Sequence, residues 1–264
     1  MSSQPSRRYN QIGLDRLVRL KWLERTAYLF LAQNKATAVK TALQEDLQGA
    51  FRSNNIKIRG SLDKTITILM RIWVRPPYDL HPLQREGLKF LSLLPREDHI
   101  AVHWGMAMAV YPFWGAVAAH VGRLLRLQGT IAANQVQRRV REQYGERETV
   151  SRRVRYVLRS FVDWKVLKET SEKGIYTAGL SLAVENVALI AWLVEAFLHT
   201  HPNGSVALRT VLDSTSLFPF RLSPISAVHL TAVSGRLDVL RHGLDQDLIM
   251  LRTESRQAAK GGGS

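Results

Sequence analysis

The chain has 264 residues, 45% of them hydrophobic, which is enough to bury a sizeable core as one large domain or two to three small ones. Its formal net charge of +15 exceeds what solubility requires, so we expect a polyanionic partner, either nucleic acid or an acidic lipid surface. The absence of cysteine excludes disulfides, a thiol nucleophile and thiolate metal ligands.

The basic excess is concentrated in two segments. Residues 1–60 hold 11 basic and 4 acidic residues (+7), and residues 123–173 hold 13 and 6 (+7). Residues 61–122 hold 6 and 5 (+1), and residues 174–264 hold 7 and 7, a net charge of zero. The first and third segments are therefore the candidate polyanion-binding regions.

The start of the chain is polar and resembles no secretory signal, and together with the lack of cysteine this predicts a cytoplasmic, nucleoid-associated protein. Residues 100–121 are apolar over the length of a bilayer crossing, but they include histidines, glycines and a proline. We expect a buried helical hairpin or a kinked helix there, and no membrane partner. Residues 258–264 are set aside as a linker or tag remnant.

The N-terminal region, residues 1–127, is predicted to be a helical domain. Apolar spacing predicts helices over residues 13–33 and 36–51, a break at 53–55, and a third helix that Ser61 or Asp63 caps and Pro76 ends. Residues 78–98 are expected to be a polar connection with one short helix. The apolar surface from Trp104 to Trp114 is expected to dock a partner.

Basic residues in the N-terminal segment permit two interpretations. They form either an arm and helix that extend a DNA footprint, or a disordered terminus followed by an ordinary amphipathic helix. The residues concerned are Arg7, Arg8, Arg16, Arg19, Lys21 and Arg25.

Residues 129–178 show the pattern of two helices followed by a hairpin. Gly129 and Thr130 predict a break and a cap, after which a short helix runs to Tyr144. Thr149 is expected to cap a second helix with a buried apolar stripe spaced i, i+4, i+7, i+8 and i+11. The stripe consists of Val150, Val154, Val157, Leu158 and Phe161. The opposite, exposed face is predicted to carry Ser151, Arg152, Arg153, Arg155, Tyr156 and Arg159.

Two short β-type runs, residues 164–168 and 174–177, follow the second helix and are joined by polar residues, which predicts a hairpin. The run from Val154 to Phe161, then Asp163 to Leu167, then Gly174 to Tyr176, resembles the recognition helix, second strand, wing and third strand of the winged-helix (helix-turn-helix) DNA-binding superfamily. In style the chain is also similar to accessory DNA-binding proteins of bacterial mobile elements and antiviral defence systems. The resemblance covers about 50 of the 264 residues.

The winged-helix resemblance implies which residues contact duplex DNA. The second helix would face the major groove, with arginines on phosphates or on the guanine O6/N7 edge. The preceding helix and the wing would hold the DNA backbone. The implied DNA-binding residues are Arg138, Arg139, Arg141, Ser151, Arg152, Arg153, Arg155, Arg159, Lys168 and Lys173.

Two other interpretations of these arginines stay open. In the first, the arginines form a simple solvated helix face. In the second, the protein is a scaffold or adaptor, and the arginines of its winged helix contact an acidic protein partner. RNA binding is disfavoured because no aromatic stacking platform is apparent.

The C-terminal lobe, residues 181–257, shows a weaker version of the same pattern. We expect a helix over 183–199, a turn at 202–204, a short helix to Leu212, and strands near 218–222, 227–231 and 236–240. Because its net charge is zero, this lobe is either a degenerate winged helix that contacts a protein partner or another copy of the chain, or an irregular lobe packed on the first domain.

No catalytic or metal-binding pattern is evident. His99 and His103 share a helical spacing but lack an accompanying carboxylate, so they are expected to be buried or capping histidines. Phosphate-cradling glycine motifs, a nucleophile elbow and a carboxylate cluster are missing. The sequence therefore predicts a mainly α protein with small β-hairpins: a helical domain (1–127), a winged helix (128–180) and the C-terminal lobe. Its expected function is non-catalytic duplex DNA binding, without cofactor or small-molecule substrate, as the DNA-reading subunit of a larger complex or as a regulator.

Overall fold

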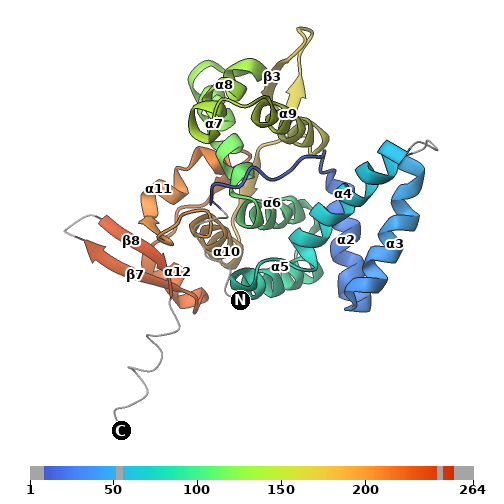
Figure 1. The fold of residues 1–264 in the computed structure, drawn as a ribbon. Coiled ribbons are helices and arrows are strands. Elements are labelled where there is room, and N and C mark those ends of the chain that lie inside the picture. Colours follow the sequence, from blue (N-terminus) through green and yellow to red (C-terminus); the bar gives the residue numbers. More distant parts are fainter. Residues whose placement is uncertain (1–8, 52–55, 243–245, 253–264) are drawn as a thin grey trace.

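The computed structural model describes residues 9–51, 56–242 and 246–252. Over these residues the protein is mainly helical, with small sheets of two or three strands (Figure 1). The expected fold class, mainly α with small β-elements, is confirmed at this level. The expected break at 53–55 lies outside the described residues.

Helices dominate the first half of the chain. They are α2 (Leu20–Gln33), α3 (Ala36–Gln48), α4 (Ile56–Trp73), α5 (His81–Leu93), α6 (His99–Val110) and α7 (Pro112–Gln128). Short 3-10 turns lie at Gly49–Phe51, Tyr78–Leu80 and Arg96–Asp98. Residues 78–98 were expected to be a polar connection with one short helix; the helix is α5, which runs for 13 residues and buries an apolar face. Ser61 and Asp63 lie inside α4 rather than at its start, so the predicted cap is wrong.

Residues 13–19 were expected to begin a helix, but α2 begins only at Leu20. The segment is extended because its backbone bonds to another helix: the Val18 amide donates to Ser160 Oγ at 3.0 Å, and the Val18 carbonyl accepts from Trp164 Nε1 at 2.9 Å. Leu14 is buried and has a φ of 62°, which a helix excludes. Tertiary contacts therefore override the helical periodicity of this segment.

The apolar stretch at 100–121 forms two helices, α6 and α7, that meet at Tyr111. Every residue of α6 is buried. Among the described residues no single helix is long and apolar enough to cross a bilayer. The helices Arg96–Val110 and Pro112–Gln128 reach the length and apolar composition of a membrane span only when they are taken together, and the chain bends by 117° between them.

Trp104 lies at the centre of a buried aromatic cluster that joins distant parts of the chain. Its ring stacks on Phe161 with centroids 4.9 Å apart and meets Trp114 and Phe220 edge-on at 5.3 and 5.7 Å. Because Trp104 and Trp114 are both fully buried, the expected apolar docking surface between them is wrong.

After α7, the chain forms a three-stranded sheet, and two helices lie between its first and second strands in the sequence. The elements are β1 (Thr130–Ala132), α8 (Ala133–Tyr144), α9 (Glu148–Asp163), β2 (Leu167–Glu169) and β3 (Ile175–Ala178). The strands are antiparallel in the order β1-β3-β2. Thr130 therefore starts a strand instead of capping a helix. The predicted strand at 164–168 begins only at Leu167, because Lys165 forms a turn with a φ of 61°.

The C-terminal lobe has a similar order of elements, with two further strands and a 3-10 turn added. It contains β4 (Leu182–Val184), α10 (Val187–Leu198), β5 (Ser205–Ala207), α11 (Leu208–Leu212), a 3-10 turn η4 (Thr215–Leu217), β6 (Phe220–Leu222), α12 (Ala227–Val233), β7 (Leu237–His242) and β8 (Gln246–Leu251). Strands β5, β8 and β7 form an antiparallel sheet in the order β5-β8-β7, the same order as β1-β3-β2. The strand expected at 227–231 is wrong: these residues form α12, whose first turn is capped when the His229 amide donates to Ser226 Oγ.

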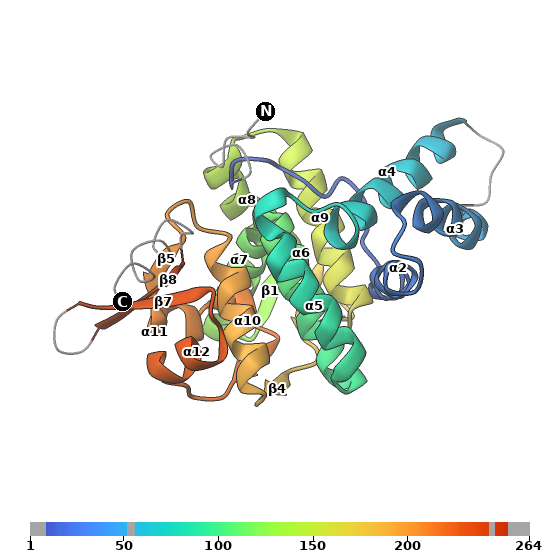
Figure 2. The ribbon, with the colours of Figure 1, turned by 90° about the horizontal axis from the view of Figure 1, so that it is seen from below.

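Helix α10 connects the C-terminal lobe to the N-terminal helices (Figure 2). Trp192 on α10 donates from Nε1 to the Leu83 carbonyl at 2.9 Å. A Cβ atom on Gly87 or Gly105 would lie 2.9 or 2.4 Å from the Trp192 ring, so both positions need glycine for the indole to fit. Residues Leu189–Leu198 are all buried, and apart from Glu195 all of them are apolar or aromatic, as expected for a helix surrounded by the core.

Candidate nucleic-acid interface

Helix α9 buries the apolar stripe that the sequence predicted. Val150, Val154, Val157, Leu158 and Phe161 are each at most 1% exposed. At about 0.8 kcal/mol per buried methylene group, burial of this stripe stabilises the packing of α9, which contacts chiefly α8. The opposite face of α9 is therefore free to meet solvent.

The exposed face of α9 carries a stripe of arginines, which we call the arginine stripe: Arg152, Arg155 and Arg159. Spaced i, i+3 and i+7, they lie on one side of the helix, and all three are exposed. Ser151 was predicted on this face, but it is 4% exposed and belongs to the buried side. The prediction of a groove-facing Ser151 is wrong.

Arg153 lies at the border of the arginine stripe. It is half-buried, and its Nε–H is buried without a hydrogen-bond acceptor among the described residues. No acidic side chain of the described residues pairs with it. Its guanidinium therefore carries an uncompensated charge beside the stripe.

Ion pairs occupy three of the predicted arginines. Arg155 Nη2 lies 2.8 Å from Glu148 Oε1, seven positions earlier on α9. On α8 and just after it, Arg139 pairs with Glu142 at 3.1 Å and Arg141 with Glu146 at 3.2 Å. All three are solvent-accessible pairs, which are worth at most about 1 kcal/mol and exchange easily for other anions.

The remaining predicted basic residues have no acidic partner among the residues that the structure describes: Arg138, Arg152, Arg153, Arg159, Lys168 and Lys173. Residues 133–163 together hold 8 basic and 4 acidic residues, a net charge of +4. The excess cannot be neutralised internally, so this part of the surface attracts anions.

The hairpin between β2 and β3 has a mixed charge. Lys168 lies opposite Thr177 in the sheet, and Lys173 precedes the turn at Gly174, where φ is 83°. Both lysines are exposed, but so are Glu169 and Glu172 beside them. The hairpin is therefore a weaker anion attractor than α9.

Two exposed basic residues that the sequence analysis left out flank α9. Arg147 immediately precedes the helix and donates from Nη2 to the Tyr144 carbonyl at 3.3 Å. Lys165 forms the turn that follows it, and its carbonyl accepts from the Leu180 amide at 2.8 Å. Their proximity to the ends of the predicted recognition helix was the available signal.

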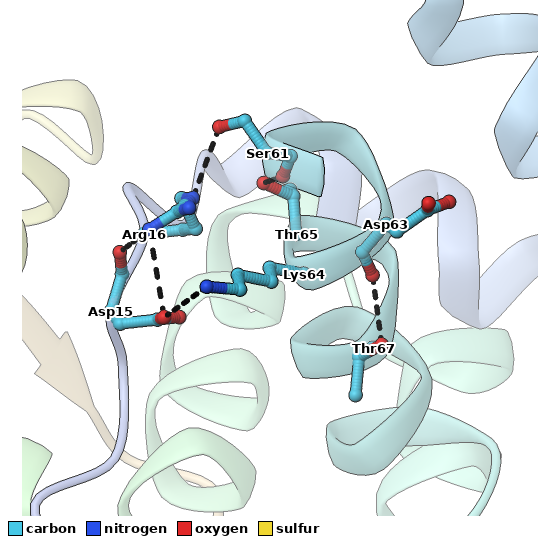
Figure 3. A network of polar contacts seen from close by, with 7 residues as sticks. All are labelled: Asp15, Arg16, Ser61, Asp63, Lys64, Thr65 and Thr67. Carbon is cyan, nitrogen blue, oxygen red and sulfur yellow. Dashed lines mark hydrogen bonds and ion pairs between the residues drawn. The ribbon is translucent and has the colours of Figure 1, made fainter. Parts of the chain in front are cut away.

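The N-terminal basic residues are mostly engaged. Arg16 donates from Nε to Ser61 Oγ at 3.0 Å and pairs with Asp15, which Lys64 also approaches at 3.8 Å (Figure 3). Arg25 pairs with Asp46 at 2.6 Å. Arg7 and Arg8 lie outside the described residues.

The arginines of the C-terminal lobe are also engaged, in contrast to Arg152 and Arg159 of the arginine stripe. Arg236 pairs with the buried Glu195 at 2.7 Å, and Arg209 and Arg241 pair with Asp213 and Asp247 at 3.6 and 3.9 Å. Arg221 donates to Ser181. The exposed face of α12 instead presents Val228 and Val233, which are 67% and 48% exposed.

His99 and His103 are both buried. His103 is fully buried and accepts from Trp73 Nε1 at 3.0 Å through Nδ1, and burial, assisted by His99, lowers the pKa of His103 to about 3. His99 Nε2 lies 3.0 Å from the Leu94 carbonyl. In the described parts of the chain, no three His, Asp or Glu side chains come together as a metal site.

The chain matches no protein-family model, no curated protein and no solved structure.

Proposed function

We propose that residues 112–178 form a winged helix that binds duplex DNA through α9. The order α7, β1, α8, α9, β2, β3 with strand order β1-β3-β2 supports this. In such an arrangement the last helix before the hairpin is the recognition helix and the hairpin is the wing. The observation that carries the proposal is the arginine stripe on the exposed face of that helix.

The proposed contacts follow from the chemistry of the stripe. The major groove of B-DNA is about 12 Å wide and admits a helix, and arginine binds phosphate or the guanine O6/N7 edge in a bidentate manner. Arg152 and Arg159, which have no acidic partner among the described residues, contact the DNA directly. Arg138 on α8 and Lys168 on the hairpin contact the backbone, where they fix position without reading sequence.

The protein acts as a non-catalytic reader of duplex DNA, either as a subunit of a larger complex or as a regulator.

The similar order of elements in the C-terminal lobe supports a second winged helix over residues 187–251, whose helix α12 has exposed apolar residues in place of arginines. This favours contact with a protein partner for the second unit. A scaffold in which α9 itself binds an acidic protein is the competing function.

The test is fluorescence anisotropy of a short labelled duplex of random sequence, titrated over a salt series with wild type and with Arg152→Glu/Arg159→Glu. If about six to eight phosphates are neutralised, log K falls with log salt with a slope of roughly −5 to −7. The double variant is expected to lose at least about tenfold in affinity at low salt and to show a less negative salt slope, because it neutralises fewer phosphates. Arg153 is left unchanged because its half-buried side chain makes a folding defect harder to exclude.

The matched control is Arg85→Glu/Lys89→Glu, which changes the net charge equally. Both residues are exposed and lie four positions apart on α5, a helix that Figure 1 shows at the opposite end of the view from α9. We expect the control to bind nearly as wild type does. Equal losses for the two double variants would contradict a specific role for α9 and leave only a non-specific effect of net charge. Absence of binding by folded wild type at low salt would favour the acidic protein partner.

A further inference from the structure

The arginine stripe ends in an acidic residue. Asp163, the last residue of α9, lies four positions after Arg159 and eleven after Arg152, so it continues the same face of the helix. Its side chain is 17% exposed. Alone, this carboxylate would repel a phosphate backbone that follows the stripe.

The start of α2 supplies basic residues at this point. Arg19 Nη1 lies 3.5 Å from Asp163 Oδ1, and the Arg19 guanidinium lies over the Trp22 ring at 5.3 Å, which fixes its position. Lys21 is exposed and has no ion-pair partner among the described residues. Burial raises the pKa of Asp163, whereas Arg19, the Leu20 amide and Lys21 all lower it, so Lys21 lies within electrostatic reach of the carboxylate.

Contacts on both sides hold this part of the chain in place. Towards α9, Val18 is bonded to Ser160 and Trp164 through its two backbone groups. Towards α4, Arg16 is bonded to Ser61, and Asp15 pairs with Lys64 (Figure 3). The position of the α2 start relative to α9 is therefore set by buried hydrogen bonds rather than by charge alone.

We propose that the start of α2 is a second DNA-contacting element, in which Lys21 binds a backbone phosphate beyond the C-terminal end of α9 while Arg19 neutralises Asp163. The charges at this end are then −1 for Asp163 and +1 each for Arg19 and Lys21, a net +1 where α9 by itself has −1. The basic surface thus continues from α9 onto α2. This inference rests on the proposed DNA binding by α9.

The experiment measures duplex binding over a salt series for Lys21→Gln, Arg19→Gln, Asp163→Asn and the double variant Arg19→Gln/Asp163→Asn of the full chain. Loss of one phosphate contact makes the salt slope less negative by about 0.9, so Lys21→Gln is expected to show that change and a several-fold weaker affinity. Arg19→Gln is expected to weaken binding in wild type but to have little effect beside Asp163→Asn, because Arg19 acts through Asp163. Lys40→Gln on α3, also exposed and without an ion pair among the described residues, is the control and is expected to leave the slope unchanged.

Two results would overturn the inference while leaving DNA binding by α9 intact. One is a Lys21→Gln protein with the affinity and slope of Lys40→Gln. The other is an equal loss for Arg19→Gln with and without Asp163→Asn. If Arg152→Glu/Arg159→Glu binds normally, both the proposed function and this inference are rejected. Because Lys21 is exposed, its variant decides the question even if Arg19→Gln fails to fold.

Discussion

Glu148 shows how a single side chain can oppose the function of its neighbour. It lies in the first turn of α9, where a negative charge interacts favourably with the helix dipole, and it holds Arg155 at 2.8 Å. The same ion pair removes Arg155 from the set of unpaired arginines on the stripe. A phosphate that binds Arg155 must therefore displace Glu148.

We predict that Glu148→Gln strengthens DNA binding several-fold, because it frees Arg155 and removes a negative charge from the interface. The same variant is expected to lower the free energy of unfolding by about 0.3–1 kcal/mol through the lost dipole interaction. Anisotropy titration and urea denaturation measure the two effects. Glu45→Gln, on the exposed surface of α3, serves as the control for net charge. Weaker binding by Glu148→Gln would mean that Glu148 contacts the partner itself.

At the scale of residues, the sequence predicts apolar burial better than polar burial. The spacing of Val150, Val154 and Val157 identified the inner face of α9 correctly because apolar side chains mark it directly. Ser151 and Ser160 of the same helix are also buried, although they are polar. Ser160 accepts a hydrogen bond from the amide of Val18, a residue 142 positions earlier in the chain. A contact so distant in sequence leaves no periodic signal.

At the scale of elements, glycines determine how closely α7 approaches η4. A Cβ atom on Gly122 would lie 2.2 Å from the Thr215 carbonyl oxygen and 2.6 Å from Phe218 Cβ. Neither atom can move without shifting its backbone. Gly60, in contrast, is an exposed residue of α4, and a Cβ atom added to it would meet no other atom within 4 Å.

We predict opposite effects for alanine at these two helical glycines. Gly122→Ala is expected to lower the free energy of unfolding by about 1–3 kcal/mol through overpacking. Gly60→Ala is expected to raise it by about 0.5–1 kcal/mol, since alanine is the better helix former. Urea denaturation of both variants gives the comparison. A Gly122→Ala protein as stable as wild type would show that α7 and η4 do not pack this closely.

Several elements could not be predicted because distant partners create them. The three-residue strand β1 exists through its pairing with β3, more than 40 residues later. Residues 227–231 were expected to be a strand, but the Ser226 cap and the burial of Ala227 and Leu230 favour α12. The helices α8 and α9 were predicted nearly in full, because their periodicity is local.

At the scale of the whole molecule, the buried His103 links stability to pH. Its pKa is about 3 in the folded protein, against 6.5 for an unperturbed histidine, so between these values only the unfolded chain binds the proton. Stability therefore falls as pH decreases from 6.5 towards 3, by up to about 1.4 kcal/mol per pH unit for this one group.

We predict that His103→Gln, which keeps an acceptor for Trp73 Nε1, shows a weaker loss of stability than wild type when the pH is lowered from 6.5. Urea midpoints measured above the range in which ordinary carboxylates titrate, about pH 4, isolate the histidine contribution. The exposed His81→Gln is the control and is expected to retain the wild-type pH dependence. Parallel curves for His103→Gln and wild type would contradict the prediction.

The fold class and the pattern of the basic region were predictable from the sequence, whereas the relation between the parts was not. Charge and hydrophobic periodicity can be read from a single segment, so they indicated the basic region at residues 129–178 and the two faces of α9. The Trp192 contact with Gly87 and Gly105 joins segments that are far apart in the chain, and no local pattern predicts it.

This contact has a consequence for dividing the protein into fragments. By the order of elements α10 belongs with the C-terminal lobe, yet its indole fills the space between α5 and α6. A protease cut in the connection between β4 and α10 would therefore yield two pieces that stay associated, and a chain ending near residue 180 would expose the empty indole site to water. The two halves of the molecule are distinct in chain order at this connection, but the buried indole is expected to keep them associated in solution.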